Sequence, residues 1–341
     1  MRQQQELKPI EPGEAKEWYL ENRRGEIADA TYQAHKYRLS PFVEWCDGEG
    51  IDNLNYVSGR HFHKYKKWRR EKGDCKKVTM VTQLSTLKVF IKFCESIDAV
   101  QQGMSEYIDP PTMKNKEDVN DDFVDAETAE TILRYNRKYN YSHRGHVIFE
   151  LLWHTGMRNG ALRSLDVGDF HPDDRALEVQ HRPDEDTPLK NGKEGERVVS
   201  LKPKVNEIVQ DYVEHHRIPK EDEYGREPLL TTRQGRISKG AIRSACYRAT
   251  RPCKYGLGCP HDRDPETCDA ANSYHAASKC PSSHASHSLR KGAITHARRM
   301  DIPIDAVSER MDVSADVLKK HYDKRTKKQE METRRGYFDN I

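Results

Sequence analysis

Residues 287–322 read HSLRKGAITHARRMDIPIDAVSERMDVSADVLKKHY, a stretch in which a His, an Arg and a Tyr stand on predicted helices. His287 and Arg290 are three residues apart, so on a helix they project from one face and can converge on one anion. The apolar pattern of residues 302–311 predicts a second helix, and a polar turn then leads to a third helix that carries Tyr322. This order can return a tyrosine to the His/Arg pair.

An upstream stretch supplies a second arginine. Residues 155–170 read TGMRNGALRSLDVGDF, in which Gly156 predicts a turn and Arg158 stands at the start of a helix. Cleavage of a phosphodiester needs guanidinium groups for the charge on the non-bridging oxygens, a nucleophile in line and an acid for the leaving oxygen. Two arginines and a tyrosine provide part of this set.

These motifs resemble the tyrosine recombinase (phage integrase) family. An Arg after TG and a hydrophobic residue, a hairpin Lys, the HxLR motif and a C-terminal Tyr occur in family order over roughly half of the chain. The chain also looks like Xer-like recombinases and the integrases of archaeal viruses and plasmids. The resemblance implies a mainly α-helical fold with a small antiparallel β-sheet, in which an N-terminal helical core-binding (SAM-like) domain precedes a catalytic domain.

The resemblance also implies the roles of five residues. Tyr322 would attack a DNA phosphodiester to give a 3′-phosphotyrosine, while Arg158 and Arg290 would bind the non-bridging oxygens. Lys190, in the loop PLKNGKEG between two predicted strands, would protonate the leaving 5′ oxygen, and His287 would accept the tyrosine proton or orient the phosphate. No cofactor is needed for this chemistry.

Alternatives remain at two of these positions. Lys193 lies in the same predicted hairpin as Lys190, and Tyr337 also stands near the C-terminus. Taken singly, each candidate also fits an ordinary role, such as a solvated loop lysine or a packed tyrosine.

The sequence departs from the commonest family pattern in two places. That pattern has an acidic residue shortly after the first Arg, where this chain has Ala161, and a His or Trp in a Gly-His-like turn before the nucleophile, where it reads MDVS with Asp312. An ionised aspartate cannot donate a hydrogen bond to phosphate, so we assign no catalytic role to Asp312. Either His321 supplies the missing hydrogen-bond donor, or the site has one donor fewer.

Length and periodicity predict two domains. The 341 residues suffice for two cores, with 35% hydrophobic and 33% charged residues. We expect a helical core-binding domain over residues 1–103, a linker rich in Pro and charge over 104–122 and a catalytic domain over 123–341. Within the catalytic domain, helices are expected at 126–139, 147–156, 205–215 and 237–248, and strands at 177–181 and 197–201.

A basic helix is expected in the first domain at about residues 59–72. Nine Lys and Arg and only two acids occur between Arg60 and Lys77, although the net charge of the chain is only +3. This excess favours contact with a phosphate backbone over a merely solvated face. The predicted DNA-binding residues are Lys64, Lys66, Lys67, Arg69, Arg70, Lys76 and Lys77.

Four of the eight cysteines crowd into an insertion at residues 251–284, immediately before the HxLR motif. They are Cys253, Cys259, Cys268 and Cys280, with the spacing C-x5-C-x8-C-x11-C. A segment this poor in apolar residues has little else to fold it, so we predict a structural zinc site with these four ligands. Free thiols in a loop are the alternative.

Composition also bears on location and partners. No apolar run is long enough to cross a bilayer and the start has no signal-peptide pattern, so we expect a soluble cytoplasmic protein without a membrane partner. By resemblance the partner is double-stranded DNA, and the functional unit is a homo-tetramer. The rival hypotheses are a DNA-binding regulator that has lost the chemistry, a metal-dependent nuclease that uses the Cys/His cluster, and a topoisomerase.

Overall fold

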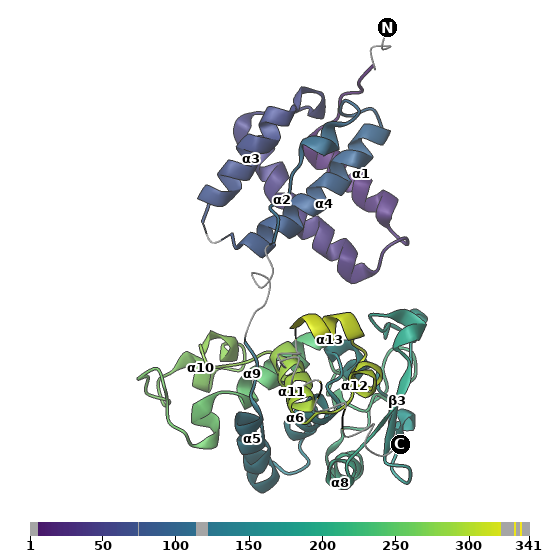
Figure 1. Ribbon diagram of the computed structural model, residues 1–341, viewed down its shortest axis with the longest axis vertical. Helices are drawn as coiled ribbons and strands as arrows, with labels where there is room; N and C mark the ends of the chain where they lie inside the picture. Colours follow the sequence, from purple (N-terminus) through teal and green to yellow (C-terminus); the bar gives the residue numbers. More distant parts are fainter. Residues whose placement is uncertain (1–5, 74, 114–121, 322–330, 332–334, 336–341) are drawn as a thin grey trace. The chain divides into compact units, whose positions relative to one another are not determined.

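The structure is a computed structural model, and it describes residues 6–73, 75–113, 122–321, 331 and 335. The chain divides into two compact units, Met1–Asn120 and Asp121–Ile341 (Figure 1). Each unit has its own hydrophobic core.

The described part of the first unit is helical. Its core contains aromatic side chains from neighbouring helices, such as Phe42 and Tyr65, whose rings meet edge to face at 5.3 Å. The basic helix begins after Ser58, which forms a capping box with His61, and buries Phe62 and Tyr65 on its apolar face. The elements are α1 (Pro12–Arg23), α2 (Asp29–Glu49), η1 (Leu54–Tyr56), α3 (Gly59–Glu71), α4 (Lys77–Ser96) and η2 (Met104–Tyr107).

The core of the first unit continues beyond residue 103, where the sequence analysis began the linker. Met104 is buried, and the backbone N–H of Ser105 donates a hydrogen bond of 2.5 Å to Glu95 of α4. Ile108 is also part of this core. The short turn η2 therefore closes the helical unit rather than leading out of it.

The second unit is built around α6, which is buried on nearly every side. A helix buried all round is typical of a core position, and α6 packs against α5, α8, α9 and α11 (Figure 1). The helices are α5 (Ala126–Tyr139), α6 (Arg144–Thr155), α7 (Asn159–Ser164), α8 (Pro203–Asp211), α9 (Lys239–Ala249), α10 (Asp269–Asn272), α11 (Ser286–Arg299), α12 (Ile304–Met311) and α13 (Ala315–His321). Shorter helical turns are η3 (Val167–Asp169), η4 (Pro183–Glu185), η5 (Gly192–Gly195), η6 (Tyr212–His216), η7 (Pro252–Tyr255) and η8 (Ala277–Lys279).

A small antiparallel sheet flanks these helices. Its strands are β1 (Phe170–His171), β2 (Ala176–Val179) and β3 (Arg197–Ser200), in the order β1-β2-β3. Leu177 pairs with Val199, and both side chains are buried. A second hairpin joins β4 (Thr231–Thr232) to β5 (Gly235–Arg236). The predicted fold class, mainly α with a small antiparallel sheet, is therefore confirmed.

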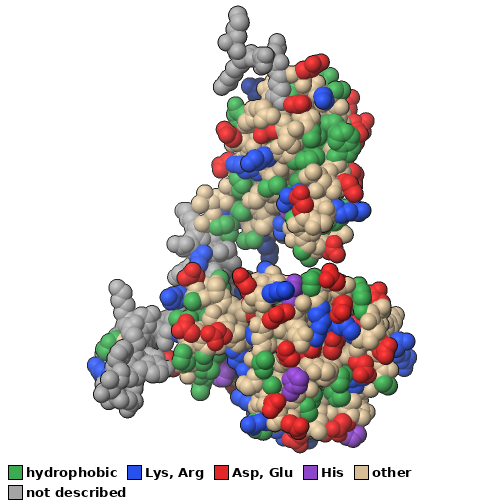
Figure 2. All heavy atoms as spheres, turned by 90° about the vertical axis from the view of Figure 1, so that its right-hand side faces the viewer, with side chains coloured by type: hydrophobic (Ala, Val, Ile, Leu, Met, Phe, Trp, Pro, Cys, Tyr) green, Lys and Arg blue, Asp and Glu red, His purple; other side chains and the backbone are tan. Residues whose placement is uncertain are grey.

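Charged side chains of both signs are interspersed on the face of the molecule that Figure 2 shows. This agrees with a chain in which one residue in three is charged. Among the described residues, no helix combines the length and the apolar composition that crossing a membrane requires.

Candidate active site

Arg290 is fixed by the ends of two other helices. It lies in the first turns of α11, is only 4% exposed, and its Nη1 donates hydrogen bonds to the carbonyl oxygens of Gly156 at 2.7 Å and Met311 at 2.5 Å. Its Nη2 donates to the carbonyl of Asp312 at 3.1 Å. These carbonyls belong to the C-terminal ends of α6 and α12, where main-chain oxygens lack helical partners and the helix dipole favours a cation. The fold thus builds a site for this guanidinium from backbone atoms.

Arg158 meets Arg290 at Asp312. Arg158 precedes α7 directly, and its Nη1 pairs with the Oδ2 atom of Asp312, whose carbonyl accepts from Arg290. The Arg158 side chain keeps 28% of its surface exposed. Two arginines that are 132 positions apart in the sequence therefore share one residue. This convergence agrees with the expectation that both arginines bind the non-bridging oxygens of one phosphate.

The loop between β2 and β3 brings Lys190 to the same place. Leu189 is buried and its backbone N–H donates to Nδ1 of His181 at 2.9 Å, while Asn191 donates from Nδ2 to Oδ1 of Asp312 at 2.6 Å. Lys190 is thus held between two anchored neighbours, and its own side chain is exposed. Lys193 lies in η5 of the same loop and is also exposed.

His287 lies in the first turn of α11 and is surrounded by cations. Burial lowers the pKa of His287 below its usual value, and the positive charges of Lys291, Arg290, Arg158 and Lys190 lower it further. The imidazole is therefore neutral near pH 7 and can accept a proton. All four charges are thus close enough to His287 to act on its imidazole.

Arg197, at the start of β3, was not among the predicted site residues. Its Nε donates to the carbonyl of Arg310 at 2.9 Å and its Nη1 to that of Gly195 at 2.7 Å. Burial lowers the pKa of Arg197, the carboxylate of Asp312 raises it, and the charges of Arg158 and Arg310 lower it. The guanidinium therefore adds to the positive field around Asp312. A lone Arg at a strand end carries no sequence signal for such a role.

Asp312 takes the place of a glycine in the turn before α13. Its backbone is left-handed, with φ 52°, at the C-cap of α12, where glycine is the usual residue. In the Gly-His-like turn of the family pattern, Asp312 thus stands at the Gly position and Val313 at the His position. Val313 is buried and has no side-chain donor. Arg158 nevertheless has an acidic partner, because Asp312 pairs with it while Ala161 is buried and apolar.

A buried carboxylate stabilises α6 beneath this site. Oε1 of Glu150 lies 3.1 Å from Nε2 of His146 and accepts from Nε of Arg137 at 3.0 Å, and Oε2 lies 3.0 Å from Nε2 of His154. Burial alone would raise the pKa of Glu150, but the hydrogen bond with His146, the close contact with His154 and the charges of His154 and Arg137 hold it far below its usual value.

The predicted nucleophile lies outside the described residues. Helix α13 ends at His321, one residue before Tyr322, and packs against the core through the fully buried Leu318. Tyr337, the alternative, is outside the described residues as well.

The predicted DNA-binding residues lie on or next to α3. Lys64 pairs with Glu49 at 3.9 Å and Lys67 with Glu71 at 3.8 Å, across exposed surface. Lys66 donates to the carbonyl of Asp109 at 2.7 Å, and Arg69 donates to Gln83 at 3.0 Å. The side chains of Arg70, Lys76 and Lys77 are exposed.

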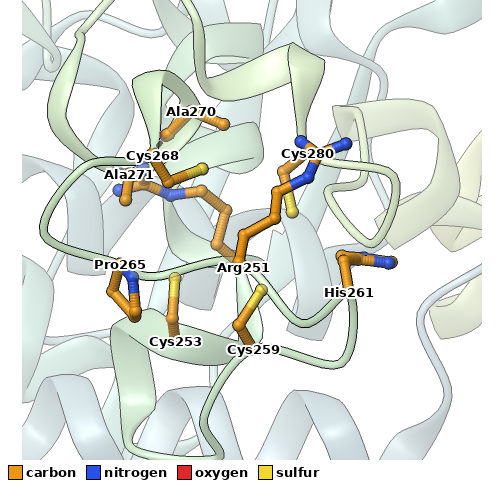
Figure 3. Close-up of a pocket in the computed structure, with 10 residues that line it drawn as sticks. Arg251, Cys253, Cys259, His261, Pro265, Cys268, Ala270, Ala271 and Cys280 are labelled. Carbon is orange, nitrogen blue, oxygen red and sulfur yellow. Dashed lines mark hydrogen bonds between the residues drawn. The ribbon is translucent and has the colours of Figure 1, made fainter.

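The four clustered cysteines line one pocket in the insertion. Figure 3 shows their side chains pointing toward its interior, whereas the ring of His261 points away. Backbone hydrogen bonds from Ala271 lower the pKa of Cys268, with smaller contributions from Ala270 and Arg263. In Figure 1 the insertion lies on the opposite side of α11 from β3, so it is remote from the loop that holds Lys190.

Comparison with known proteins gives the class. The model of the Phage integrase family matches residues 122–329, which is more than half of the chain and nearly all of the second unit. The chain therefore belongs to the phage integrase, or tyrosine recombinase, family.

Two solved integrase structures show the same fold. The Tn1549 transposon integrase in complex with transposon right end DNA is 14% identical, with a TM-score of 0.64, over 97% of this chain and 99% of that one. A lambda integrase dimer bound to a COC′ core site is 13% identical, with a TM-score of 0.63, over 92% of this chain and 77% of that one. The N-terminal domain of a phage integrase/site-specific recombinase from Haloarcula marismortui is 30% identical over 30% of this chain and 99% of that one, with a TM-score of 0.30. No curated protein matches the chain.

Proposed function

We propose that this protein is a site-specific DNA recombinase of the integration and excision type that acts through a 3′-phosphotyrosine intermediate. The observation that carries the proposal is the meeting of Arg158 and Arg290 at Asp312, with Lys190 and His287 beside them. These cations and the one carboxylate form a site of net positive charge, which suits a phosphate group.

The proposed reaction exchanges one phosphorus–oxygen bond for another. The phenol oxygen of Tyr322 attacks phosphorus, and the bond from phosphorus to the 5′ oxygen of the next nucleotide breaks. His287 accepts the phenol proton, and Lys190 gives a proton to the departing 5′ oxygen. The phosphodiester energy is kept in the phosphotyrosine, so the 5′-hydroxyl of another strand can reverse the step without ATP.

The surroundings of the residues fit these roles. Because Arg290 is held by main-chain carbonyls, its guanidinium need not reorganise as charge develops on the phosphate. Burial first, and the nearby cations second, lower the pKa of His287 and keep its imidazole neutral, which a base must be. Lys190 is exposed on an anchored loop, so its ammonium can reach a bound strand.

Asp312 would act as a positioning residue. Its carboxylate holds Arg158 and Asn191, and its carbonyl holds Arg290, so it connects both arginines to the hairpin loop. It would thereby supply the acidic partner of the first arginine that the family pattern places near position 161. The negative charge of Asp312 also repels a phosphate group, but the attraction by the surrounding cations is larger.

DNA binding would involve both units. Helix α3 of the first unit offers exposed basic side chains such as Lys64, Lys67 and Arg70, which suit a phosphate backbone. Strand exchange between two duplexes needs four cleavages, so the proposed working unit is a homo-tetramer on double-stranded DNA.

A covalent-adduct assay tests the proposal. Candidate attachment sites, nicked so that the short fragment with the 5′-hydroxyl diffuses away, should trap the wild-type protein on DNA in a denaturing gel. Tyr322→Phe should abolish the adduct, whereas the matched variant Tyr337→Phe should retain it. An adduct that survives Tyr322→Phe would refute the assignment of the nucleophile.

A second candidate is a DNA-binding regulator of the same fold without cleavage. The observation that favours it is the carboxylate of Asp312 on Arg158, where a phosphate would bind. Tight binding to the same DNA without any adduct, at each nick position tried, would support this candidate and reject the recombinase.

A further inference from the structure

The insertion at residues 251–284 has almost no hydrophobic core. Between Arg251 and His284, the buried hydrophobic residues are Ala270, Ala276 and Ala277, whose side chains are single methyl groups. Leu257, the one leucine in the segment, is 68% exposed. Burial of a few methyl groups contributes on the order of 1 kcal/mol each, far less than the conformational entropy of ordering this many residues. Something other than apolar packing must hold the segment.

The two ends of the insertion meet at one point. The backbone N–H of His284 donates to Oγ1 of Thr250 at 2.7 Å, so the chain leaves α9 and returns toward α11 at the same place. Arg251 donates from Nη1 to the carbonyl of Ala270, which connects the base to α10. These bonds hold the two ends of the insertion together. They do not stabilise its interior, which contains the pocket lined by the four cysteines.

The pocket has the donor atoms of a closed metal site. Its lining includes Cys253, Cys259, Cys268 and Cys280 and no carboxylate (Figure 3). Four thiolates are a typical tetrahedral shell for zinc, and such a shell leaves no open position for a substrate.

The neighbouring histidines have other partners. Nε2 of His261 lies 2.9 Å from Oγ of Ser282, and its ring points away from the pocket (Figure 3). Nδ1 of His284 lies 2.6 Å from the carboxylate of Asp122, outside the insertion. The cysteines are therefore the better set of ligands.

We propose that the four cysteines bind one structural zinc ion that folds the insertion. Among the described residues, no three of the four sulfurs lie within 4.8 Å of one another, so the ion would draw the walls of the pocket together. Zinc to sulfur bonds of about 2.3 Å would then connect η7, α10 and η8 through one centre. Because α11 begins just after the insertion, the ion would also fix the segment that precedes the first turn of α11, where His287 lies. This proposal goes beyond the DNA chemistry and does not depend on it.

The full-length protein, expressed with zinc and dialysed against metal-free buffer, tests the site by elemental analysis. We expect one zinc per chain, and after exchange with Co²⁺ the absorption bands of tetrahedral thiolate ligation. Cys268→Ser should lose most of the metal. Cys75→Ser is the matched control, because Cys75 is a half-buried free cysteine in the first unit, and it should keep one zinc per chain.

Thiol titration of the native wild-type protein gives a readout that requires no variant. Cys46, Cys94 and Cys246 are buried, so without zinc the reactive thiols would be Cys75 and the four clustered cysteines. We expect only Cys75 to react until a strong chelator releases the metal, and the insertion to become protease-sensitive at that point. Protein that contains no zinc and shows all five thiols reactive, or an intact mass that reveals disulfides, would overturn the proposal. Loss of zinc in His261→Ala would overturn the four-cysteine set.

Discussion

Arg290 and Arg251 are both buried arginines that donate hydrogen bonds to main-chain carbonyls, but they lie in regions of opposite construction. Arg290 is surrounded by helices whose apolar faces form the core of the second unit. Arg251 stands at the base of an insertion that buries little more than alanine. Two regions of one compact unit can therefore be stabilised by different interactions. Packing and backbone carbonyls hold the site, and we propose that cysteine ligands hold the insertion.

The largest expected effect is on the rate of adduct formation, which should fall on substitution of Arg290 but not of Arg251. Arg290→Ala removes a guanidinium aimed at the proposed phosphate, so we expect adduct formation to slow by about 10²- to 10³-fold or more. Arg251→Ala should leave the rate of adduct formation within about twofold and instead make the insertion more sensitive to protease. If Arg290→Ala does not fold, Arg290→Lys is the substitute test. It keeps the positive charge but loses the planar guanidinium, so we expect adduct formation to be strongly impaired as well. Wild-type rates in both Arg290 variants would contradict the assigned role.

The next contrast concerns buried and exposed acids. Glu150→Gln removes a fully buried charge that His146, His154 and Arg137 contact, and we expect a loss of about 3 kcal/mol in the free energy of unfolding at pH 7. The folded-state pKa of Glu150 lies below its unfolded-state value, so its contribution is complete above about pH 4.5 and is lost as the pH falls toward the folded-state pKa. The difference between wild type and variant in urea unfolding should therefore shrink below about pH 4.

Asp269→Asn is the matched variant in the insertion. The Asp269 side chain is 81% exposed, and its carboxylate lies 3.9 Å from Nζ of Lys279. An exposed pair of this kind contributes little, so stability should change by less than about 0.5 kcal/mol at either pH. Equal losses in Glu150→Gln and Asp269→Asn would contradict a special contribution of the buried carboxylate.

Two glycines test how closely each region is packed. A Cβ on Gly292 of α11 would stand 1.9 Å from the carbonyl oxygen of Val124 and 2.8 Å from the ring of Trp153, so Gly292→Ala should cost about 2 kcal/mol or more. Gly256 has φ 86° and open space around it, so Gly256→Ala should cost about 1 kcal/mol of backbone strain, confined to the insertion. Hydrogen exchange would locate each effect. Global unfolding caused by Gly256→Ala would show that the insertion is coupled to the core more tightly than proposed.

A smaller effect on the chemistry than that of Arg290→Ala is expected at Arg158, which the side chain of Asp312 holds. Asp312→Asn keeps the shape but removes the charge that pairs with Arg158, so we expect adduct formation to slow by about 1.5 kcal/mol, roughly tenfold. DNA binding should become slightly tighter, because a negative charge near the phosphate is lost. Weaker binding together with unchanged chemistry would contradict a positioning role.

Periodicity and motif order predicted much of the fold. The helix over residues 126–139 is observed as α5 with the same bounds, and the expected strands at 177–181 and 197–201 correspond to β2 and β3. β1, β4 and β5 have two residues each, so no alternation of apolar and polar residues could reveal them. The sequence also placed the end of the first unit too early for η2, because a short turn that packs by Met104 and Ile108 has no helical period.

In the site, too, the sequence predicted some residues and not others. Arg158, Lys190, His287 and Arg290 stand in motifs, so their order in the chain pointed to them. Asn191 and Arg197 contribute through contacts with residues more than 100 positions away, and nothing in their local sequence marks those contacts. The importance of Asp312 follows from its left-handed backbone, which only the fold determines.

The hydrogen bond between His284 and Thr250 has a consequence for how such a chain can change in evolution. Because both ends of the insertion start from one point beside α9, the segment can lengthen, shorten or be exchanged without altering the distance from α9 to α11. The number of residues between Arg158 and Arg290 is thus free to drift while their separation in space stays constant. Related chains should then differ most in length at this position.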